Sequence, residues 1–417
     1  MEQMQKKKHL RFSILLCNLT THYDTTIYIL LVPIIAPLFF STTTQSLAIT
    51  KGYGATLIGI IARPLGIIYF SNLAHKKGAL QALSSSIIGI TFATSAMILV
   101  PSGALFSSIT LLLIRGLQSF FAAGENNLAK LYVLKKDKLS HNTLSTMEYE
   151  TSSLAGIAIA SLCAYVCSRY PNFWRLAFFL SLPGVVFSTI MRVNITKNPY
   201  SDAKTDQFNQ NSPKALLTFL KKNKNVLFKM SFLHGFNYFT YSLAFIFINI
   251  WASTINPNIR YEKMLSLNVP FLGLDSLVLL IFYNYKRSVV YIAKIAPLLP
   301  GVLGILIVVA FWQAENSKMY LCVNILRMCV IVIGTACSIS FTDITFNASI
   351  KISNNRYLFY GICYCIGSDL LGRSLPSVGM LLIQHTKSHW PLVCFCVTIC
   401  VVSSFCALSL QKFVKQK

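Results

Sequence analysis

Charge is scarce in this chain, and negative charge is scarcest. Only 12% of the 417 residues are Asp, Glu, Lys or Arg, and the 13 acidic residues face 37 Lys and Arg. An average soluble domain carries about 25% charged residues. Together with a hydrophobic share of 54%, this shortage excludes an ordinary soluble protein and predicts that most of the chain lies in lipid.

Motifs that would mark an enzyme are also missing. We find no nucleophile elbow, no metal-ligand cluster and no phosphate-binding loop, so we expect no cofactor and no metal. The 12 cysteines lie largely in apolar stretches, where a thiol is a small packing group. A large soluble domain and a cleavable leader are not expected either, since the polar start runs into an apolar stretch that holds Asp24 and continues past Phe40.

Long hydrophobic stretches recur instead from end to end. A helix needs about 20 apolar residues to cross a bilayer. We predict twelve spans, near 12–40, 45–74, 79–101, 103–130, 143–168, 172–192, 227–253, 264–284, 289–312, 319–346, 357–385 and 389–411. The sequence therefore predicts an all-α polytopic membrane protein, with an N-terminal six-helix half over 1–193, a cytoplasmic central loop over 194–225 and a C-terminal half over 226–417.

The net charge of +24 raises the question of nucleic-acid binding. A nucleic-acid protein gathers its basic groups on one face or arm. Here most of the 37 Lys and Arg lie at the N-terminus, in the even-numbered loops and at the C-terminus. The positive-inside rule then predicts that both termini are cytoplasmic. We expect the lipid bilayer as a partner and no nucleic acid, and we predict no oligomeric state.

Ionisable residues within the spans are the strongest functional signal. Such groups are costly at membrane depth and persist mainly where they face a bundle interior or a water-filled path. About half of the acidic residues lie in or at the edge of a span: Asp24, Glu125, Glu148, Glu150, Asp275, Asp343 and Asp369. Four arginines lie within spans: Arg63, Arg115, Arg327 and Arg373.

In span four, Arg115, Gln118 and Glu125 fall on one helical face. Arg115 and Glu125 are about 15 Å apart along the helix, too far to pair. Each therefore needs water or a partner on another helix, and Arg63 and Asp24 are candidates in the same half. An ion pair that only fixes helix register remains possible. We favour a proton or substrate site, because burial disfavours a charged carboxylate and a nearby cation restores it.

Span one is unusually polar, with Asp24 and Tyr28 on one stripe and Asn18, His22 and Thr25 on the next. This pattern favours a solute path over lipid contact, although His22 alone favours a packing role.

Span seven places Asn237 and Tyr241 four residues apart, where both could bond a solute. Its aromatic rings could receive a quaternary ammonium group or simply pack. In span eleven, Asp369 and Arg373 are at i and i+4, which predicts a structural ion pair.

Four segments carry a resemblance to a known family. They are 23–28 in span one, 62–66 with Arg63-Pro64-Leu65-Gly66 in span two, 117–125 ending in Gly124-Glu125 in span four, and 174–179 at the start of span six. They resemble the metabolite:proton symporters of the major facilitator superfamily, the branch that includes proline/betaine and organic-acid transporters. The resemblance is strong in the first half and loose in the second.

The resemblance implies the major facilitator fold, alternating access by rocking of two halves, and proton-coupled symport of a zwitterionic osmolyte or organic acid across a bacterial inner (plasma) membrane. On this basis we expect H⁺ coupling at Asp24 and Glu125. We expect substrate contacts at Tyr28, Arg63, Arg115, Gln118, Asn237 and Tyr241.

The chain departs from the family at its gating loop, residues His75, Lys76, Lys77 and Gly78. The family's Gly, Asp and Arg are replaced here by Ser71, His75 and Ala79, and the corresponding stretch 284–287 has also lost its acid. These changes keep two alternatives open: an uncoupled facilitator or exchanger on the same fold, and a membrane sensor derived from a transporter.

Overall fold

A computed structural model describes residues 2–40, 45–103, 106–136, 142–184, 186–187, 190, 213–256, 258–284, 292–314, 319–352 and 356–415. Every regular element in these residues is a helix. A helix is the form that long apolar stretches require, because it satisfies its own backbone hydrogen bonds without water. The predicted all-α class is confirmed.

Eight helices among the described residues are long and apolar enough to cross a membrane: Arg11–Phe39, Leu47–Ala74, Ala79–Leu99, Glu148–Arg169, Lys224–Ile255, Tyr261–Phe282, Met319–Ile352 and Trp390–Phe413. The helix Leu299–Ala314 is apolar but shorter. The remaining predicted spans, 103–130, 172–192 and 357–385, also coincide with helical segments. The chain is thus a multi-pass membrane protein.

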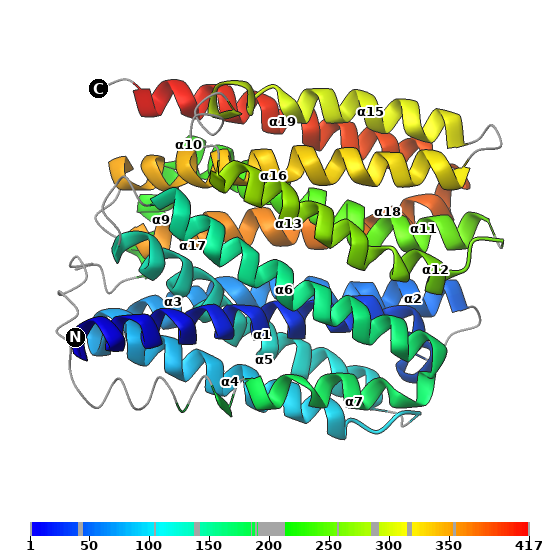
Figure 1. The fold of residues 1–417 in the computed structure, drawn as a ribbon, viewed down its shortest axis with the longest axis horizontal. Helices are drawn as coiled ribbons and strands as arrows, with labels where there is room; N and C mark the ends of the chain where they lie inside the picture. Colours follow the sequence, from blue (N-terminus) through cyan, green and yellow to red (C-terminus); the bar gives the residue numbers. More distant parts are fainter. Residues whose placement is uncertain are drawn as a thin grey trace. The chain divides into compact units, whose positions relative to one another are not determined.

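The chain divides into two compact units (Figure 1). The first unit comprises Met1–Asn211 and Asn354–Ile362, and the second comprises Ser212–Ser353 and Cys363–Lys417. Each unit is described by itself below.

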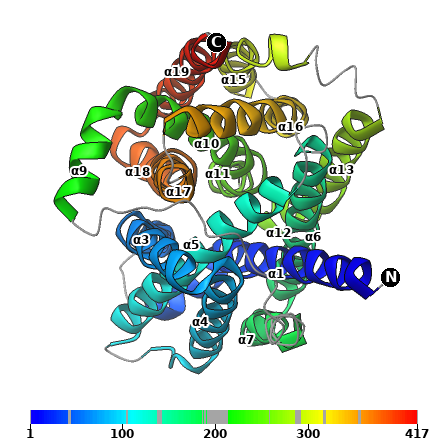
Figure 2. The same cartoon turned by 90° about the vertical axis from the view of Figure 1, so that its left-hand side faces the viewer.

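The first unit holds α1 (Glu2–Phe39), α2 (Gln45–Gly54), η1 (Ala55–Ile58), α3 (Gly59–Lys77), α4 (Ala79–Leu99), α5 (Ser107–Lys136), α6 (Asn142–Arg169), η2 (Pro171–Phe173) and α7 (Trp174–Phe179). Helix α5 packs against α1, α3 and α4, as the end-on view in Figure 2 shows. The apolar faces of these helices meet inside the unit, and α5 lies where its polar face can reach three neighbours.

Helix α1 packs along α6. A Cβ atom on Gly156 would overlap the backbone of Leu19, so the glycine allows the two backbones to approach closely. The Asn18 side chain donates to Ser152 Oγ and Ser153 Oγ, both at 2.7 Å. Asn18 therefore joins α1 to α6, which accounts for one polar residue of the stripe predicted to line a solute path.

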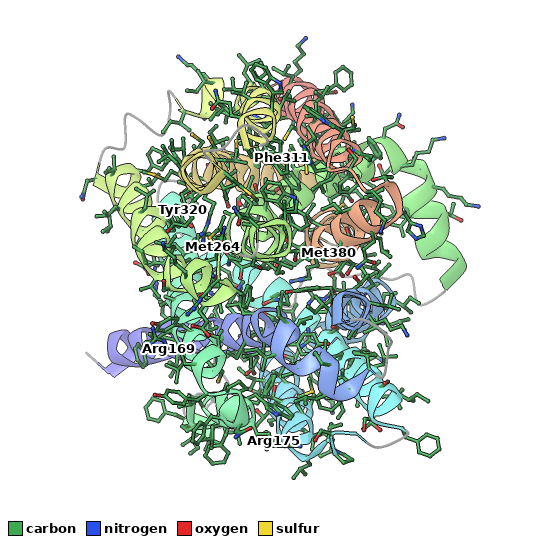
Figure 3. All side chains as sticks on the ribbon, turned by 90° about the vertical axis from the view of Figure 1, so that its right-hand side faces the viewer. Arg169, Arg175, Met264, Phe311, Tyr320 and Met380 are labelled. Atoms are coloured by element: carbon green, nitrogen blue, oxygen red, sulfur yellow. The ribbon has the colours of Figure 1, made fainter. Side chains whose placement is uncertain are left out.

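Two ionisable residues close the ends of the first unit's helices. Arg175 donates from Nε to the Ile98 carbonyl at 3.3 Å and from Nη2 to the Val100 carbonyl at 3.2 Å, which satisfies the end of α4. Figure 3 labels Arg175 at this end of the unit. Glu148 pairs with Arg11 at 2.6 Å, with both side chains partly exposed, so this ion pair adds little stability.

The second unit holds α9 (Pro213–Lys222), α10 (Lys224–Ser242), η3 (Leu243–Phe247), α11 (Ile248–Ile255), α12 (Tyr261–Ser266), α13 (Asn268–Asn284), α15 (Leu299–Ala314), α16 (Met319–Ile352), η4 (Ser368–Arg373), α18 (Leu375–Thr386) and α19 (Trp390–Lys415). Helix α17 (Arg356–Gly367) leads into η4. Both η3 and η4 are π-helical turns, a rare form that often occurs at functional sites.

The two units repeat one arrangement at a fixed interval in the chain. Helix α16 begins at Met319, which is 212 residues after α5 begins at Ser107. The same interval relates Arg327 to Arg115 and Asp275 to Arg63. Internal repeats of this kind are usual in transporter folds. The repeat is too diverged to be visible as sequence identity, and helix bounds reveal it.

Candidate functional site

A chain of hydrogen bonds inside the first unit joins a carboxylate to an arginine. Thr94 Oγ1 on α4 donates to Asp24 Oδ2 on α1 at 3.2 Å. Gln118 Nε2 on α5 donates to Thr94 Oγ1 at 3.1 Å, and Arg115 Nη1 donates to Gln118 Oε1. All four side chains are buried. Residues predicted separately from spans one and four therefore form one network, which we call the Asp24 network.

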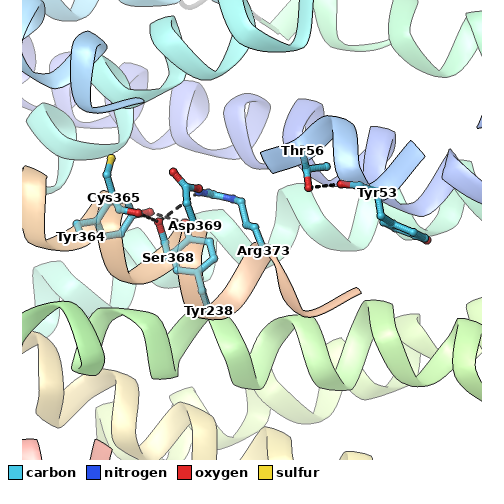
Figure 4. A network of polar contacts seen from close by, with 8 residues as sticks. All are labelled: Tyr53, Thr56, Tyr238, Tyr364, Cys365, Ser368, Asp369 and Arg373. Atoms are coloured by element: carbon cyan, nitrogen blue, oxygen red, sulfur yellow. Dashed lines mark hydrogen bonds and ion pairs between the residues drawn. The ribbon is translucent and has the colours of Figure 1, made fainter. Parts of the chain in front are cut away.

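Arg115 is held from its other side by an aromatic ring. Its guanidinium lies 4.0 Å from the centroid of the Tyr28 ring, a cation–π contact that is stronger when desolvated. The Tyr28 hydroxyl donates to the Gly52 carbonyl at 3.0 Å, which fixes the ring against α2. The chain turns there into η1, where Thr56 Oγ1 donates to the Tyr53 carbonyl at 2.6 Å (Figure 4).

Two further residues of the first unit act on the Asp24 network. Ser181 lies within hydrogen-bonding range of the Asp24 carboxylate. Arg63 on α3 is buried and close enough to Arg115 for the two charges to repel each other. Gly59, one turn before Arg63, leaves room for that side chain, because a Cβ there would lie 3.3 Å from Arg63 Nε. The predicted grouping of Asp24, Arg63 and Arg115 is thus present.

Glu125 lies apart from the Asp24 network. It is fully buried, and Ser86 Oγ on α4 donates to its Oε2 at 3.4 Å. Glu125 is about 10 Å beyond Gln118 along α5, and Ser86 is about 12 Å before Thr94 along α4. The two carboxylates predicted for proton coupling are therefore one to two helical turns apart in depth, each with a hydroxyl from α4.

The predicted solute contacts of span seven belong to the second unit. Asn237 and Tyr241 on α10 are both partly buried. The Tyr241 ring packs against Phe245 with a centroid distance of 5.6 Å. Asn237 Oδ1 is buried without a hydrogen-bond donor among the described residues. A solute amine or hydroxyl could donate to it, so a solute role for Asn237 remains a prediction.

The π-helical turn η4 carries the predicted pair of span eleven (Figure 4). Arg373 Nη1 contacts Asp369 Oδ1 at 2.6 Å and Ser368 Oγ at 3.3 Å. The Arg373 guanidinium also lies 4.5 Å from the centroid of the Tyr238 ring, and the Tyr238 hydroxyl bonds that of Tyr364. The ion pair therefore forms and ties η4 to α10, as expected for a structural role.

The predicted gating loop is mostly helix. Helix α3 continues through Lys77, and only Gly78, with φ of 92°, stands between α3 and α4. Lys76 and Lys77 are exposed. The positive φ requires glycine. The His75 side chain and residues 285–287 of the corresponding stretch lie outside the described residues.

Sequence reasoning missed the hydroxyl groups that connect the charged residues. Thr94 and Ser86 lie eight residues apart on α4, facing Gln118 and Glu125, which lie seven apart on α5. Matching spacing on two neighbouring spans is the signal that could have found them. Among the described residues, no group of three His, Cys, Asp or Glu side chains is placed to hold a metal ion.

Comparison with known proteins shows where this geometry belongs. No family model matches the chain. Over 97% of both chains, the structure superposes on the xylose transporter XylE from E. coli, in its partially occluded inward open conformation, with a TM-score of 0.65 and 14% sequence identity. The chain has the major facilitator fold. Its parallel halves and long helices are those the sequence predicted.

Curated relatives carry transporter names. The chain is 32% identical over 157 residues to a Staphylococcus aureus protein named "Putative proline/betaine transporter", a match that covers 35% of this chain and 34% of that protein. It is 23% identical over 209 residues to the proline/betaine transporter of Salmonella typhimurium, covering 48% and 42%. The matched region thus spans about a third to two fifths of these relatives. These comparisons confirm the predicted resemblance.

Proposed function

We propose that this protein is a secondary transporter that moves a small zwitterionic or anionic metabolite together with a proton. The observation that carries the proposal is the Asp24 network, in which a buried carboxylate is joined to a buried arginine through Gln118 and Thr94. The named relatives support the class of solute, since they are proline/betaine transporters. In this proposal the protein resides in the plasma membrane with both termini in the cytoplasm.

The direction of the hydrogen bonds explains how a proton could be sensed. Arg115 donates to Gln118, Gln118 donates to Thr94, and Thr94 donates to Asp24. Every donor therefore points toward Asp24, an order that suits an ionised carboxylate and polarises the network. A proton on Asp24 adds a donor at the end of the network, so the Thr94 hydroxyl no longer has a full negative charge to donate to.

Protonation of Asp24 also changes the charge that Arg115 experiences. The ionised carboxylate attracts Arg115 through the network. Once Asp24 is neutral, the arginine retains its charge and its buried Nε has no hydrogen-bond acceptor among the described residues. A solute carboxylate can then replace the lost negative charge. Proton and solute would each favour binding of the other, which is the reciprocal coupling that symport needs.

The aromatic and amide groups of α10 supply a place for the solute's other end. Asn237 offers an unoccupied acceptor and Tyr241 an aromatic ring. An ammonium or quaternary ammonium group is attracted by both kinds of group. A zwitterion such as proline or betaine presents a carboxylate and such a cation, so it matches the available chemistry better than a multiply charged acid does.

An uncoupled facilitator on the same fold is the second candidate. The observation that favours it is the α3–α4 connection, where exposed Lys76 and Lys77 replace a family pattern that includes an acid. A facilitator would equilibrate the solute across the membrane and would ignore a proton gradient. A sensor would move no solute.

Uptake into proteoliposomes tests the proposal. Labelled proline, glycine betaine, citrate and ketoglutarate would be supplied with and without an inward proton gradient, to wild type, Asp24→Asn and Glu125→Gln. We expect gradient-driven accumulation of one solute in wild type, lost in Asp24→Asn while exchange of internal for external solute persists. Thr25→Ala is the matched control, because the neighbouring Thr25 hydroxyl bonds only the α1 backbone, at 3.0 and 3.2 Å.

The possible results separate the candidates. Accumulation that survives in Asp24→Asn would refute the role of Asp24, and its loss in Glu125→Gln alone would transfer that role to Glu125. Equilibration that ignores the gradient in wild type would identify a facilitator. Absence of uptake for all four solutes would count against transport of this class.

A further inference from the structure

Arg327 is a fully buried arginine that the proposed transport mechanism does not use. It lies on α16, with 0% of its surface exposed. Its Nη2 donates to Asn268 Oδ1 at 2.5 Å, and its guanidinium lies 4.4 Å from the centroid of the Phe271 ring. Nε and Nη1 have no hydrogen-bond acceptor among the described residues. A guanidinium offers five N–H donors, so most of its hydrogen-bonding capacity is unused.

The group that holds Arg327 is rigid because a π-helical turn fixes it. The Phe245 carbonyl, within η3, accepts from Asn249 Nδ2 at 2.7 Å and from Asn268 Nδ2 at 3.1 Å. Asn249 Nδ2 also donates to Asn268 Oδ1 at 3.1 Å. These bonds orient the Asn268 amide so that its oxygen faces Arg327. The arginine is therefore positioned by neutral amides from two other helices.

Negative charge is what this site lacks. Arg327 makes no ion pair with any described residue. The nearest carboxylate along the α13–α16 contact is Asp275, which accepts a hydrogen bond from Thr335, eight residues beyond Arg327. Tyr320 acts on Arg327 electrostatically, but a phenol is neutral at ordinary pH. A buried guanidinium without a counter-charge is strongly unfavourable, so buried charges are paired as a rule.

We propose that Arg327, Asn268 and the Phe271 face form a binding site for a single negative charge, supplied by a halide ion or by the carboxylate of the transported solute. Such an anion would accept the two unused arginine donors and neutralise the charge. The amide N–H groups of Asn249 and Asn268 are committed to Phe245, so the arginine alone would bind the anion. The solute arm of this proposal rests on the proposed transport function, whereas the halide arm does not.

The test measures thermal unfolding of the purified full-length protein in detergent. Sodium chloride, bromide or acetate, or proline, would be titrated against sodium gluconate at constant ionic strength. We expect the wild-type Tm to rise saturably, by about 2–8 °C well above the Kd. Asn268→Asp supplies a carboxylate where the residue already contacts Arg327. This variant should lose the response, and Arg327→Gln should lose it by removing the charge.

The controls keep the result interpretable. Arg175→Gln removes another arginine, one that bonds only backbone carbonyls and a ring, and should keep the anion response. A response to halide without solute would identify an inorganic anion, and a response only to carboxylates would identify the solute. A Tm that ignores every anion, or an unchanged response in Asn268→Asp, would overturn the proposal, including where Arg327→Gln fails to fold. Failure of uptake would leave the halide result standing.

Discussion

Arg115 and Arg327 occupy equivalent positions, 212 residues apart on α5 and α16, yet their surroundings differ. Both are buried, and both stack on an aromatic ring, Tyr28 for one and Phe271 for the other. Arg115 is connected to a carboxylate through two neutral side chains, whereas Arg327 ends on an amide. The repeat therefore conserved a buried cation and its ring while the compensating charge was kept in only one unit.

The difference indicates a division of labour. A cation with an internal carboxylate can exchange that partner for a solute when a proton arrives, so its charge balance is switchable. A cation among amides has no such switch and depends on an external anion at all times. The comparison thus predicts pH sensitivity in the first unit and anion dependence in the second.

The largest expected effect is loss of transport in Arg115→Gln. Removing one partner of a buried, hydrogen-bonded charge network costs about 2–5 kcal/mol, which corresponds to a loss of roughly 30-fold or more in uptake. Arg327→Gln should instead change the anion dependence of stability. Initial uptake rates in proteoliposomes check this, with protein content matched by immunoblot. Equal losses in the two variants would remove the proposed division.

A second prediction concerns a helix crossing that both units share. A Cβ on Gly156 would overlap the Leu19 backbone, and a Cβ on Gly367 would overlap the backbone of Ser231. Leu19 and Ser231 are again 212 residues apart. Substitution by valine should destabilise either unit by about 1–3 kcal/mol or more, because a packed backbone contact cannot relax.

Detergent thermal unfolding measures this effect, and the chain supplies a matched control for each unit. A Cβ on Gly54 in the first unit, or on Gly273 in the second, meets nothing within 4 Å. Gly54→Val and Gly273→Val should therefore stay near wild type, apart from the small helix-propensity change. A large loss in the controls, or none at Gly156 and Gly367, would show that the crossings are not equivalent.

These elements also separate what sequence could predict from what it could not. Hydrophobic length predicts the spans, because lipid forces each apolar stretch to form a helix. Helical spacing predicts that Arg115 and Gln118 share a face, because both lie on one helix. The partner of that face, Thr94, is a neutral residue on another helix, and its role follows only from how α4 packs on α5.

The π-helical turns illustrate the same limit. Nothing in the composition of 243–247 or 368–373 distinguishes these segments from ordinary helix, because an extra residue in one turn is stabilised by tertiary bonds such as those of Asn249 and Asn268 to Phe245. For that reason the surroundings of Arg327 could not be predicted, although its position in a span could. The charge was visible in the sequence, and the absence of a paired carboxylate required the fold.

A third prediction compares two hydroxyl–carboxylate pairs, Thr94 with Asp24 and Thr335 with Asp275. Thr94 donates to the ionised carboxylate and so favours it, hence Thr94→Val should make the proton harder to release. The midpoint of uptake against pH should move upward by about one to two pH units, since a hydrogen bond to a charged group contributes about 1.5–3 kcal/mol. Thr335→Val should leave that midpoint in place. A shift in both variants would assign proton sensing to both units.

The smallest effect is expected at the connection between α3 and α4. Lys76 and Lys77 are exposed at the end of α3, and exposed substitutions usually change stability by less than about 0.5 kcal/mol. Lys76→Gln with Lys77→Gln should therefore leave Tm unchanged and uptake within about twofold of wild type. His75→Asp introduces an acid where the resembling family has one. If that acid latches a conformation, His75→Asp alone should slow exchange, and the slowing should disappear at high salt, because surface charge contacts are screened. Equal exchange rates in all three proteins would show that the connection carries no gate, and the cycle would then depend on the buried arginines.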